Sequence, residues 1–307
     1  MLYLTHMNLA PIKFRDILVA DGGPIRTVDI GSEMFLGREH YSAHAYLRDD
    51  LRTRRTMHTI PDMPDGVGSG KDPSTAHFRA VSEALERWAF RHCSLDDRSH
   101  FEYGFDYDPT TNGMAAYPGL FDSAARMSAR REAIERHCLI LWWEGFLGIT
   151  SIADPFEGVR AVRIDNPFSD DVVVLLWQFV DERFYTYGFG LGASVDKACW
   201  RAGIELSRTA GIVKTYYEFN NCPDRRTIEE LDHPFERRIL YFSRPEGFLD
   251  VIKKMESSPQ HEPPQTPLVI VDRKLVGPWS KYATVWRVVI EQPSREFAGK
   301  NADYFFW

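Results

Sequence analysis

Three stretches of the chain distribute apolar and polar residues in the manner of helices with one buried face. They span residues 74–92, 121–145 and 195–217. In the first stretch Ala76, Ala80 and Ala84 recur at every fourth position, which places them on one side of a helix. The second ends in an aromatic run at residues 139–143. These patterns predict three long helices.

Apolar runs of a different kind predict strands. Residues 159–164 and 172–180 are expected to form a hairpin around a turn at 166–170, and further strands are expected at 17–19, 268–271 and 282–290. The proline-rich run at residues 257–267 is typical of a stiff, exposed linker. Residues 1–60 are expected to pack as an N-terminal segment on a main domain of residues 60–307.

A glycine-rich stretch precedes each predicted helix. These stretches lie at residues 66–73, 111–116 and 188–192, and each is expected to be a turn that leads into its helix. Such a turn offers backbone amides and a positive helix end to an anion. The first does not fit the phosphate-loop pattern, because Asp72 follows Lys71 where a magnesium-binding hydroxyl would stand.

The same three helices carry glutamate and arginine in similar order. The repeated residues are Glu83, Glu86 and Arg87, then Glu132, Glu135 and Arg136, then Glu205 and Arg208. Positions i, i+3 and i+4 share a helix face, so each group converges on one side. The first glutamates are 49 (132 − 83) and 73 (205 − 132) residues apart. Unequal spacings indicate a diverged internal duplication, since a short-period solenoid would keep one period.

The repetition of these charged residues favours a binding site over an exposed helix face. A single carboxylate pair beside an arginine is most simply an exposed helix face. Charged residues on an exposed helix face, however, do not require the preceding glycines and the flanking apolar residues to be repeated with them. Carboxylate oxygens suit magnesium, and arginine supplies fork-shaped donors for phosphate oxygens. Placed around one cavity, the three helices would bind magnesium and a polyphosphate.

Composition excludes several other classes of protein. The net charge of −7, without a basic tract, argues against nucleic-acid binding. Four scattered cysteines (Cys93, Cys138, Cys199 and Cys222) with no Cys-x-x-Cys pair favour free thiols in a reducing compartment. No apolar run approaches the roughly 20 residues of a membrane span, so a cytoplasmic protein is expected.

Rival interpretations of single features are weaker. His92–Cys93 and His137–Cys138 are sequence neighbours, about 100° apart on a helix, so neither pair forms a nucleophile with its base. A carboxylate-bridged dimetal site would need Glu-x-x-His, which His137 does not complete. Trp142 and Trp143 are expected in a core or an interface. The apolar end, residues 304–307, is expected to dock on the chain or at a subunit interface.

Taken together, these motifs resemble the YcaO family of ATP-dependent peptide-backbone modifiers. That family has a Gly-Lys-Gly turn before a helix with Ser-xxx-Glu-xx-Glu-Arg, which is similar to Gly68-Ser69-Gly70 and residues 79–87. A family segment Ser-Asn-Gly-x-Ala-Ala-Gly, followed by a Glu-xx-Glu-Arg helix, resembles residues 111–136, and residues 141–143 continue the likeness. A third segment, Gly-x-Gly before Ala-xxx-Ala-xx-Glu, resembles residues 190–205. Arg287 stands in a strand similar to a late family strand, and the likeness covers about residues 60–292.

The resemblance implies both a fold and a reaction. The implied fold is α/β (α+β) and YcaO-like, with pseudo-symmetric halves whose helices pack on mixed or antiparallel sheets. In this family the oxygen of a peptide amide attacks the γ-phosphate of ATP, and the activated amide then takes a nucleophile. Cys, Ser or Thr gives an azoline, sulfide gives a thioamide, and an amine gives an amidine.

The implied substrate is the precursor of a ribosomally synthesised, modified peptide, with azoline-forming cyclodehydration favoured. The implied partners are that precursor and a leader-peptide-binding protein, in a homo-oligomer or a hetero-complex. ATP and Mg²⁺ are the implied cofactors. The residues implied to bind magnesium are Glu83, Glu86, Glu132 and Glu135, and those implied in catalysis on the phosphates are Arg87, Arg136 and Arg287. The residues implied to bind the nucleotide are Gly68, Ser69, Gly70, Lys71, Arg79, Asn112 and Glu205.

The chain departs from the family pattern at several positions. Ser69 replaces the lysine of the first turn, Arg79 replaces a small serine, and Tyr117 replaces a glycine. The acidic residue expected about eight positions before Glu132 falls on Ala124, with Asp122 nearby. These changes leave open two alternatives. One is a degenerate, non-catalytic scaffold that binds peptide, and the other is an ATP-dependent ligase of unrelated substrate.

Overall fold

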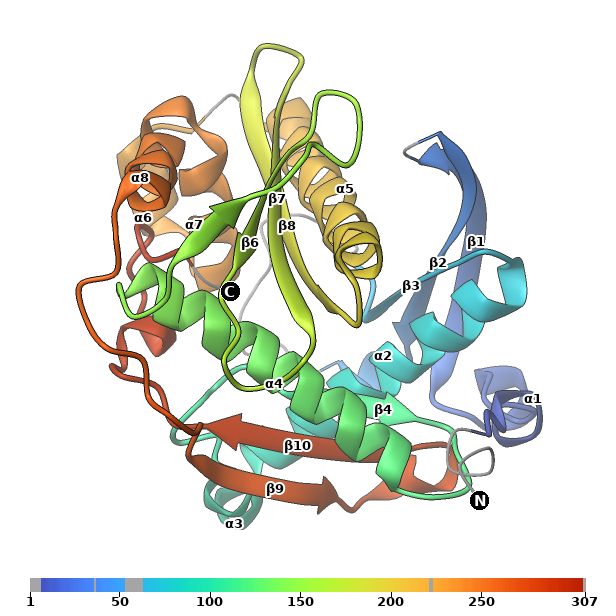
Figure 1. Ribbon diagram of the computed structural model, residues 1–307. Helices are drawn as coiled ribbons and strands as arrows, with labels where there is room; N and C mark the ends of the chain where they lie inside the picture. The colour runs from blue at the N-terminus through green and yellow to red at the C-terminus, as the bar shows by residue number, and fades with distance from the viewer. Residues whose placement is uncertain (1–6, 36, 53–62, 221–222, 306–307) are drawn as a thin grey trace. The chain divides into compact units, whose positions relative to one another are not determined.

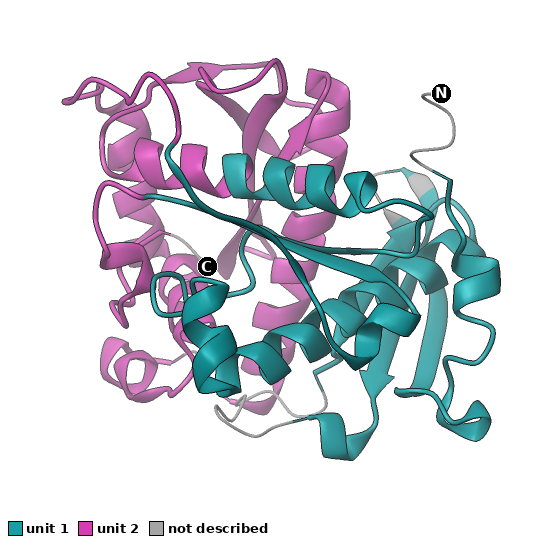
Figure 2. Cartoon of the chain, turned by 90° about the horizontal axis from the view of Figure 1, so that it is seen from below, with its two compact units in different colours: residues 1–54, 63–134, 268–291 teal, residues 55–62, 135–267, 292–307 magenta. Residues whose placement is uncertain are grey.

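The chain divides into two compact units, each described here by itself (Figure 2). The structure is a computed structural model that describes residues 7–35, 37–52, 63–220 and 223–305. Unit 1 comprises residues 1–54, 63–134 and 268–291, and unit 2 comprises residues 55–62, 135–267 and 292–307. The boundary expected near residue 60 therefore does not separate the units, because the segments on both sides of it contribute to unit 1.

Unit 1 begins with a three-stranded antiparallel sheet covered by a helix. The sheet contains β1 (Ile25–Phe35), β2 (Arg38–Leu47) and β3 (Gly66–Gly70) in that order, and α2 (Pro73–Leu95) lies across it (Figure 1). Asp72 caps α2, because its carboxylate accepts a hydrogen bond from the Thr75 backbone N–H at 2.8 Å. The predicted helix at residues 74–92 is confirmed, whereas the strand predicted at 17–19 is wrong.

A second antiparallel sheet completes unit 1. Its strands are β4 (Met114–Tyr117), β10 (Thr284–Ile290) and β9 (Val269–Leu275), with β10 central. The late strands predicted from the sequence are confirmed. The first part of α4 (Ser123–Trp143) is tied to this sheet by Arg126, whose guanidinium bonds the carboxylate of Asp272 on β9 at 2.6 Å.

Unit 2 is built on a four-stranded antiparallel sheet. Its order is β5 (Ile149–Ser151), β6 (Arg160–Ile164), β7 (Val172–Val180) and β8 (Phe184–Gly192). The predicted hairpin is confirmed as β6 and β7. The helix α5 (Val195–Phe219) lies along β7 and β8, as predicted for residues 195–217 (Figure 1).

The remaining elements are shorter. In unit 2, α6 (Arg225–Glu230), α7 (Pro234–Ser243) and α8 (Pro245–Glu256) follow α5. The shorter helices of unit 1 are α1 (Ala10–Lys13), η1 (Val19–Asp21), η2 (Asp49–Leu51), α3 (Asp97–Glu102) and η3 (Pro278–Lys281), and unit 2 adds η4 (Glu296–Ala298). The predicted linker at 257–267 has neither helix nor strand, and it leads from unit 2 back to unit 1.

Two of the three glycine-rich stretches are strands, which corrects the prediction of turns. The first forms β3, and the third forms the end of β8. Their glycines let a helix approach the strand at backbone contact. A Cβ at Gly68 would lie 2.0 Å from the Ala76 carbonyl oxygen of α2, and one at Gly190 would lie 2.6 Å from the Ala202 nitrogen of α5. Only the middle stretch turns, at Gly113 with φ +67°.

The strand and helix pair of each unit repeats the other at a constant offset of 122 residues (205 − 83). The offset relates glycines in the strands, N-cap residues, alanines under the strands and charged residues on the helices. The pairs are Gly66/Gly188, Gly68/Gly190, Gly70/Gly192, Asp72/Ser194, Ala76/Ala198, Arg79/Arg201, Ala80/Ala202 and Glu83/Glu205. The duplication is thus twofold, and the α4 segment, which follows strand β4 of another sheet, is not a third copy. Pseudo-symmetric halves on antiparallel sheets are confirmed.

Aromatic residues from the end of the chain close the core of unit 2. Phe305 is fully buried, with its ring centroid 5.8 Å from that of Trp142 and 5.6 Å from that of Trp143. The Tyr304 hydroxyl donates to the Glu144 carboxylate at 2.6 Å. Docking of the C-terminus on the chain is confirmed for these residues, whereas residues 306 and 307 lie outside the described part.

The sequence also predicts free thiols and no membrane-spanning helix. Cys93, Cys138 and Cys199 are free and buried, as expected, and Cys222 lies outside the described residues. Burial raises the pKa of the Cys93 thiol to about 12 and that of Cys138 still further, so neither supplies a thiolate for catalysis. Within the described residues, no helix has the length and apolarity needed to cross a membrane.

Two glycine substitutions in unit 2 should have opposite effects on stability. Gly190→Ala should lower the free energy of unfolding by about 1–3 kcal/mol, because the new methyl group meets the backbone of α5. Gly211→Ala, in the exposed interior of the same helix with open space around it, should raise it by about 0.5–1 kcal/mol. Urea unfolding of both variants tests this, and equal effects would contradict the packing role of Gly190.

Candidate functional site

In unit 1, one face of α2 is tied to the strand beneath it and to the loop before β4. The Val67 backbone N–H donates to Glu83 Oε2 at 3.2 Å. Arg87 Nη2 lies 3.7 Å from Glu83 Oε1, and Arg87 Nη1 donates to Thr111 Oγ1 at 2.5 Å. The glutamate and the arginine predicted to act together are therefore held together.

Glu86, one turn beyond Glu83, belongs to a like-charged pair. Its pKa is well above the ordinary carboxyl value, chiefly because of burial and then because of the nearby Glu132 carboxylate from α4. Arg87 and a hydrogen bond from the Ala116 backbone N–H act in the opposite direction. The repulsion between the Glu86 and Glu132 carboxylates is unfavourable, and a divalent cation would relieve it. The donor set therefore fits magnesium.

Arg287 supports the loop before β4, and its charge interacts with Glu86 and Glu132. It is fully buried, with its guanidinium 3.9 Å from the centroid of the Phe105 ring. Nη1 donates to the Thr110 carbonyl at 2.8 Å, and Nη2 donates to the Asp108 carbonyl at 2.5 Å. Burial lowers its pKa to about 10, so it still carries its charge near neutral pH. Arg287 thus contacts the loop backbone and the Phe105 ring, and its contact with phosphate remains a prediction.

Asn112 presents an unsatisfied donor in the same loop. The residue is 8% exposed, and its Nδ2 is buried without a hydrogen-bond partner among the described residues. Its backbone N–H donates to Thr110 Oγ1 at 3.1 Å. A buried amide without a partner is uncommon and indicates a missing ligand or water. The nucleotide contact expected of Asn112 stays a prediction.

In unit 2, the backbone of Leu191 on β8 forms hydrogen bonds with a glutamate and with an arginine. The Leu191 backbone N–H donates to Glu135 Oε2 at 2.7 Å, and the Leu191 carbonyl accepts from Arg201 Nη1 at 2.8 Å. The pKa of Glu135 is raised, chiefly by burial, while Arg136 and Arg201 lower it and Glu205 raises it. Arg201 was missed from the sequence, although its offset of 122 residues from Arg79 could have revealed it.

Two further arginines complete the cluster of unit 2. Arg208 Nη1 donates to Glu205 Oε1 at 2.9 Å, and the Arg136 guanidinium lies 4.4 Å from the centroid of the Phe189 ring. Helix α4 thus carries Glu132 in the part that belongs to unit 1, and Glu135 and Arg136 in the part that belongs to unit 2. Guanidinium groups outnumber carboxylates in this second cluster.

The predicted magnesium ligands are not gathered into a preformed metal site. Over the described ranges, no three His, Cys, Asp or Glu side chains lie close enough to hold an ion by themselves. The pairing of Glu86 with Glu132 is the arrangement that suits a cation whose other ligands come from phosphate and water. Magnesium binding by Glu83, Glu86, Glu132 and Glu135 stays a prediction.

The predicted first turn is wrong as a backbone cradle for phosphate. Gly68 and Gly70 face α2, and Ser69 is buried within β3. The Ser69 carbonyl accepts a hydrogen bond from Arg79 Nη1 at 2.6 Å, the same contact that Arg201 makes in unit 2. Lys71 is exposed between β3 and the N-cap of α2. A direct role of these residues at a nucleotide remains a prediction.

The nearest substitute for the missing acidic residue is already engaged. Asp122 accepts from Lys274 Nζ at 3.0 Å and from Thr284 Oγ1 at 2.8 Å, which ties the start of α4 to β9 and β10. Burial alone would raise its pKa, but these partners lower it overall. Ala124 is buried. The structure therefore places no free acid at this position.

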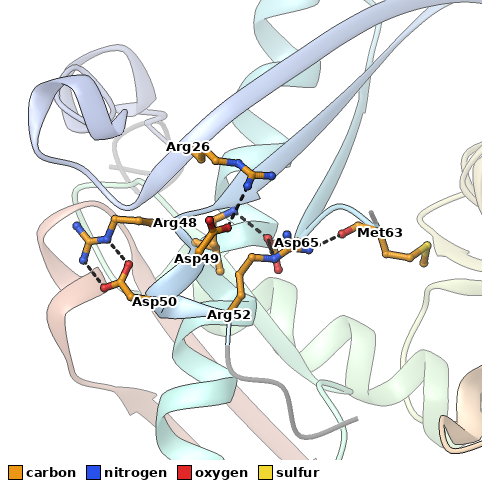
Figure 3. Close-up of polar contacts among 8 residues, drawn as sticks. Arg26, Arg48, Asp49, Asp50, Arg52, Met63 and Asp65 are labelled. Carbon is orange, nitrogen blue, oxygen red and sulfur yellow. Dashed lines mark hydrogen bonds and ion pairs between the residues drawn. The ribbon is translucent and has the colours of Figure 1, made fainter. Parts of the chain in front are cut away.

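A buried ion network fixes the start of β3. The Asp65 side chain has no exposed surface, and its Oδ2 accepts from the Leu47 backbone N–H at 2.8 Å and lies 3.1 Å from Arg52 Nε (Figure 3). Its Oδ1 accepts from Arg91 Nη1 of α2 at 2.6 Å. The Arg52 guanidinium also donates to the Met63 carbonyl at 2.9 Å. Strand β2, strand β3 and helix α2 therefore share one charged anchor.

One solved structure shows the same architecture. YcaO from Methanopyrus kandleri, whose structure was determined with AMPPCP and Mg²⁺, aligns with 92% of this chain and 88% of its own, with a TM-score of 0.52 and 13% sequence identity. The chain has a YcaO-like fold. The heterocyclase TruD aligns more distantly, with a TM-score of 0.33 and 14% identity over 60% of this chain and 29% of its own. No protein-family model matches the sequence, and no curated protein matches it.

The YcaO-like fold confirms the architecture implied by the sequence motifs. The likeness extends over both units, whereas the motifs covered residues 60–292. At 13% identity it establishes the fold and leaves the reaction to the residues of the site.

Removing the Glu86 charge should stabilise the protein when no divalent cation is present. Its pKa is raised in the folded state, so the wild-type stability should fall as pH rises above the ordinary carboxyl value of about 4.5 and through the folded pKa. Glu86→Gln keeps an acceptor for the Ala116 N–H but removes this fall. Thermal unfolding in EDTA across this pH range measures it, with exposed Glu102→Gln as control. A lower unfolding midpoint for Glu86→Gln near pH 8 would contradict the like-charge repulsion.

Loss of the Asp65 charge should strongly destabilise unit 1. Asp65→Asn leaves two partly buried arginines without their counter-charge, which should lower the free energy of unfolding by about 3 kcal/mol or more. Asp49→Asn, whose carboxylate is 78% exposed in its pair with Arg26, should have little effect. Urea unfolding compares the two variants, and similar midpoints would show that Asp65 is no anchor.

Proposed function

We propose that this protein is an ATP-dependent enzyme that activates the backbone amide of a peptide by O-phosphorylation. The observations that carry the proposal are the mutually repelling acids Glu86 and Glu132, and the buried, unsatisfied Nδ2 of Asn112 in the loop to which Arg87 of α2 is hydrogen-bonded. A cation would relieve the repulsion between the two carboxylates, and a polar ligand would accept a hydrogen bond from Asn112 Nδ2. A magnesium nucleotide contains both the cation and the polar ligand. The YcaO-like fold supports this choice, since the aligned protein of Methanopyrus kandleri was solved with AMPPCP and Mg²⁺.

The residues of the chain divide this task by chemistry. In unit 1, the carboxylates of Glu83, Glu86 and Glu132 would bind magnesium, and in unit 2 the carboxylate of Glu135 would do so. Bound magnesium would neutralise phosphate charge. Arg87 and Arg136, each next to one of these acids, would bind phosphate oxygens through charge-assisted hydrogen bonds. Most of the catalysis of phosphoryl transfer is positioning and electrostatic stabilisation, which fixed acids and guanidinium groups provide.

The proposed substrate is a ribosomally made precursor peptide, modified in the cytoplasm. Azoline-forming cyclodehydration is the favoured outcome, in which a side-chain thiol or hydroxyl attacks the phosphorylated amide and phosphate leaves. Thioamide or amidine formation would use the same activation step with sulfide or an amine. Mass spectrometry of the peptide separates them, because cyclodehydration removes one water and thioamide formation replaces oxygen by sulfur. A leader-peptide-binding protein would present the precursor.

A non-catalytic scaffold is the second candidate. It is favoured by the engagement of Asp122 with Lys274 and Thr284, which leaves the Ala124 position without a substitute acid. Such a protein would bind the peptide but not Mg-ATP. Calorimetric titration with Mg-ATP separates the two candidates, since the enzyme requires binding at physiological, millimolar nucleotide concentrations.

Neutralising the acids of unit 1 should abolish the reaction. Glu83→Gln and Glu132→Gln should each reduce ATP-dependent modification of the precursor by roughly 100-fold or more, because each removes a charged oxygen from the magnesium ligands. Glu102→Gln, an exposed glutamate of the same unit, should leave the rate unchanged. Modification of a candidate precursor peptide is followed by mass spectrometry. Unchanged modification in both variants would reject the proposed function.

A further inference from the structure

The two units differ in charge at one pair of equivalent positions. The offset of 122 residues that matches Glu83 with Glu205 places Arg208 in unit 2 where unit 1 has Glu86. The packing of strand on helix is the same in both units, so this exchange of an acid for a base lies on the helix face that carries Glu83 or Glu205. The duplicated halves therefore offer different chemistry on the same backbone.

Arg201, Glu205 and Arg208 form one stripe along α5. They stand at i, i+4 and i+7, which share a helix face. Both arginines are held in place: Arg201 by the Leu191 carbonyl at 2.8 Å, and Arg208 by Glu205 at 2.9 Å. Arg201 is exposed, and about a quarter of the Arg208 side chain is exposed (28%), so both are open to a ligand.

The surroundings of this stripe are cationic overall. Arg136 lies in the same unit, on α4, and acts on Glu135, as Arg201 does. Arg136 and Arg201 thus act on Glu135, and Arg208 bonds Glu205, which gives three guanidinium groups to two carboxylates. A second magnesium site would be opposed by the arginine at the position of Glu86. Phosphate oxygens, in contrast, match the planar fork of a guanidinium group.

We propose that Arg201 and Arg208 form a phosphate-binding pair in unit 2, which takes the polyphosphate of a nucleoside triphosphate. The equivalent face of unit 1, with Glu83 and Glu86, serves the cation instead. The identity of the nucleotide in this inference rests on the proposed function. The binding of a phosphate anion rests on the two arginines alone. Glu205 orients Arg208, and Leu191 orients Arg201.

Calorimetry with trimmed ligands tests the pair. At saturating Mg²⁺, Arg201→Gln and Arg208→Gln should each weaken ATP binding by about 10-fold or more, the loss of one or two charge-assisted hydrogen bonds. Binding of AMP, which lacks the β- and γ-phosphates, should change by less than about twofold on the same reasoning. Arg208→Lys keeps the charge without the fork, so it should recover only part of the affinity. Arg226→Gln, an exposed arginine on α6, is the matched control.

Titration of Mg²⁺ at fixed ATP gives a second readout. Arg208→Gln should leave the half-saturating Mg²⁺ concentration unchanged, whereas Glu86→Gln should raise it. Circular dichroism checks that each variant is folded. Arg201 is exposed, so its variant provides the test if Arg208→Gln fails to fold.

The outcomes separate this inference from the proposed function. If the wild type binds Mg-ATP and both glutamine variants bind it equally well, the arginine pair is rejected and the proposed function stands. If the wild type does not bind Mg-ATP, the proposed function falls. Inorganic triphosphate then tests the pair alone. Binding by the wild type that both variants lose would support the phosphate site, and absence of binding would overturn it.

Discussion

Backbone contact between a glycine strand and an alanine helix is the constraint on which the rest of this structure depends. In each unit the strand lies so close to the helix that a Cβ on the facing glycines would meet the helix backbone. The helix therefore cannot rotate or slide without a clash. Glu83 and Glu205 stand at matching positions on those fixed helices, and the Val67 N–H holds the Glu83 carboxylate. Precise packing of small residues thus fixes where the charged residues stand.

The charges themselves work against folding. Glu86 and Glu132 raise the free energy of the folded state when both are ionised, as the raised pKa of Glu86 shows. Arg287 offsets part of this cost from a fully buried position, although its own burial lowers its pKa to about 10. A structure selected for stability alone would not keep this arrangement. Perturbed acids around a loop with an unsatisfied amide are typical of a functional site.

Sequence reasoning located the helices well and misjudged the glycines. The helices follow from the spacing of apolar residues, which reports directly on burial. Glycine is depleted in strands and common in turns, so β3 and the end of β8 were predicted as turns. Their strand conformation follows from the approach of α2 and α5, which local sequence does not record. The β1–β2 hairpin was missed because much of it is exposed, and an exposed edge leaves no strict alternation of apolar residues.

Because local sequence does not record the packing of a helix on a strand, it also does not show directly which segments are duplicated. The Glu-xx-Glu-Arg motif is shared by α2 and α4, but the packing of a helix on a glycine-containing strand is shared by α2 and α5. The signal that identifies the true pair is the sequence of strand glycines, cap, alanines and arginine, which recurs at one offset in both units. Those residues carry the packing, so they were retained. Glu86 and Arg208 are not among the residues that meet the strand glycines, so an acid at this position of one helix could correspond to a base in the other without loss of the fold. Duplication of a rigid scaffold therefore permits equivalent positions on α2 and α5 to carry opposite charges.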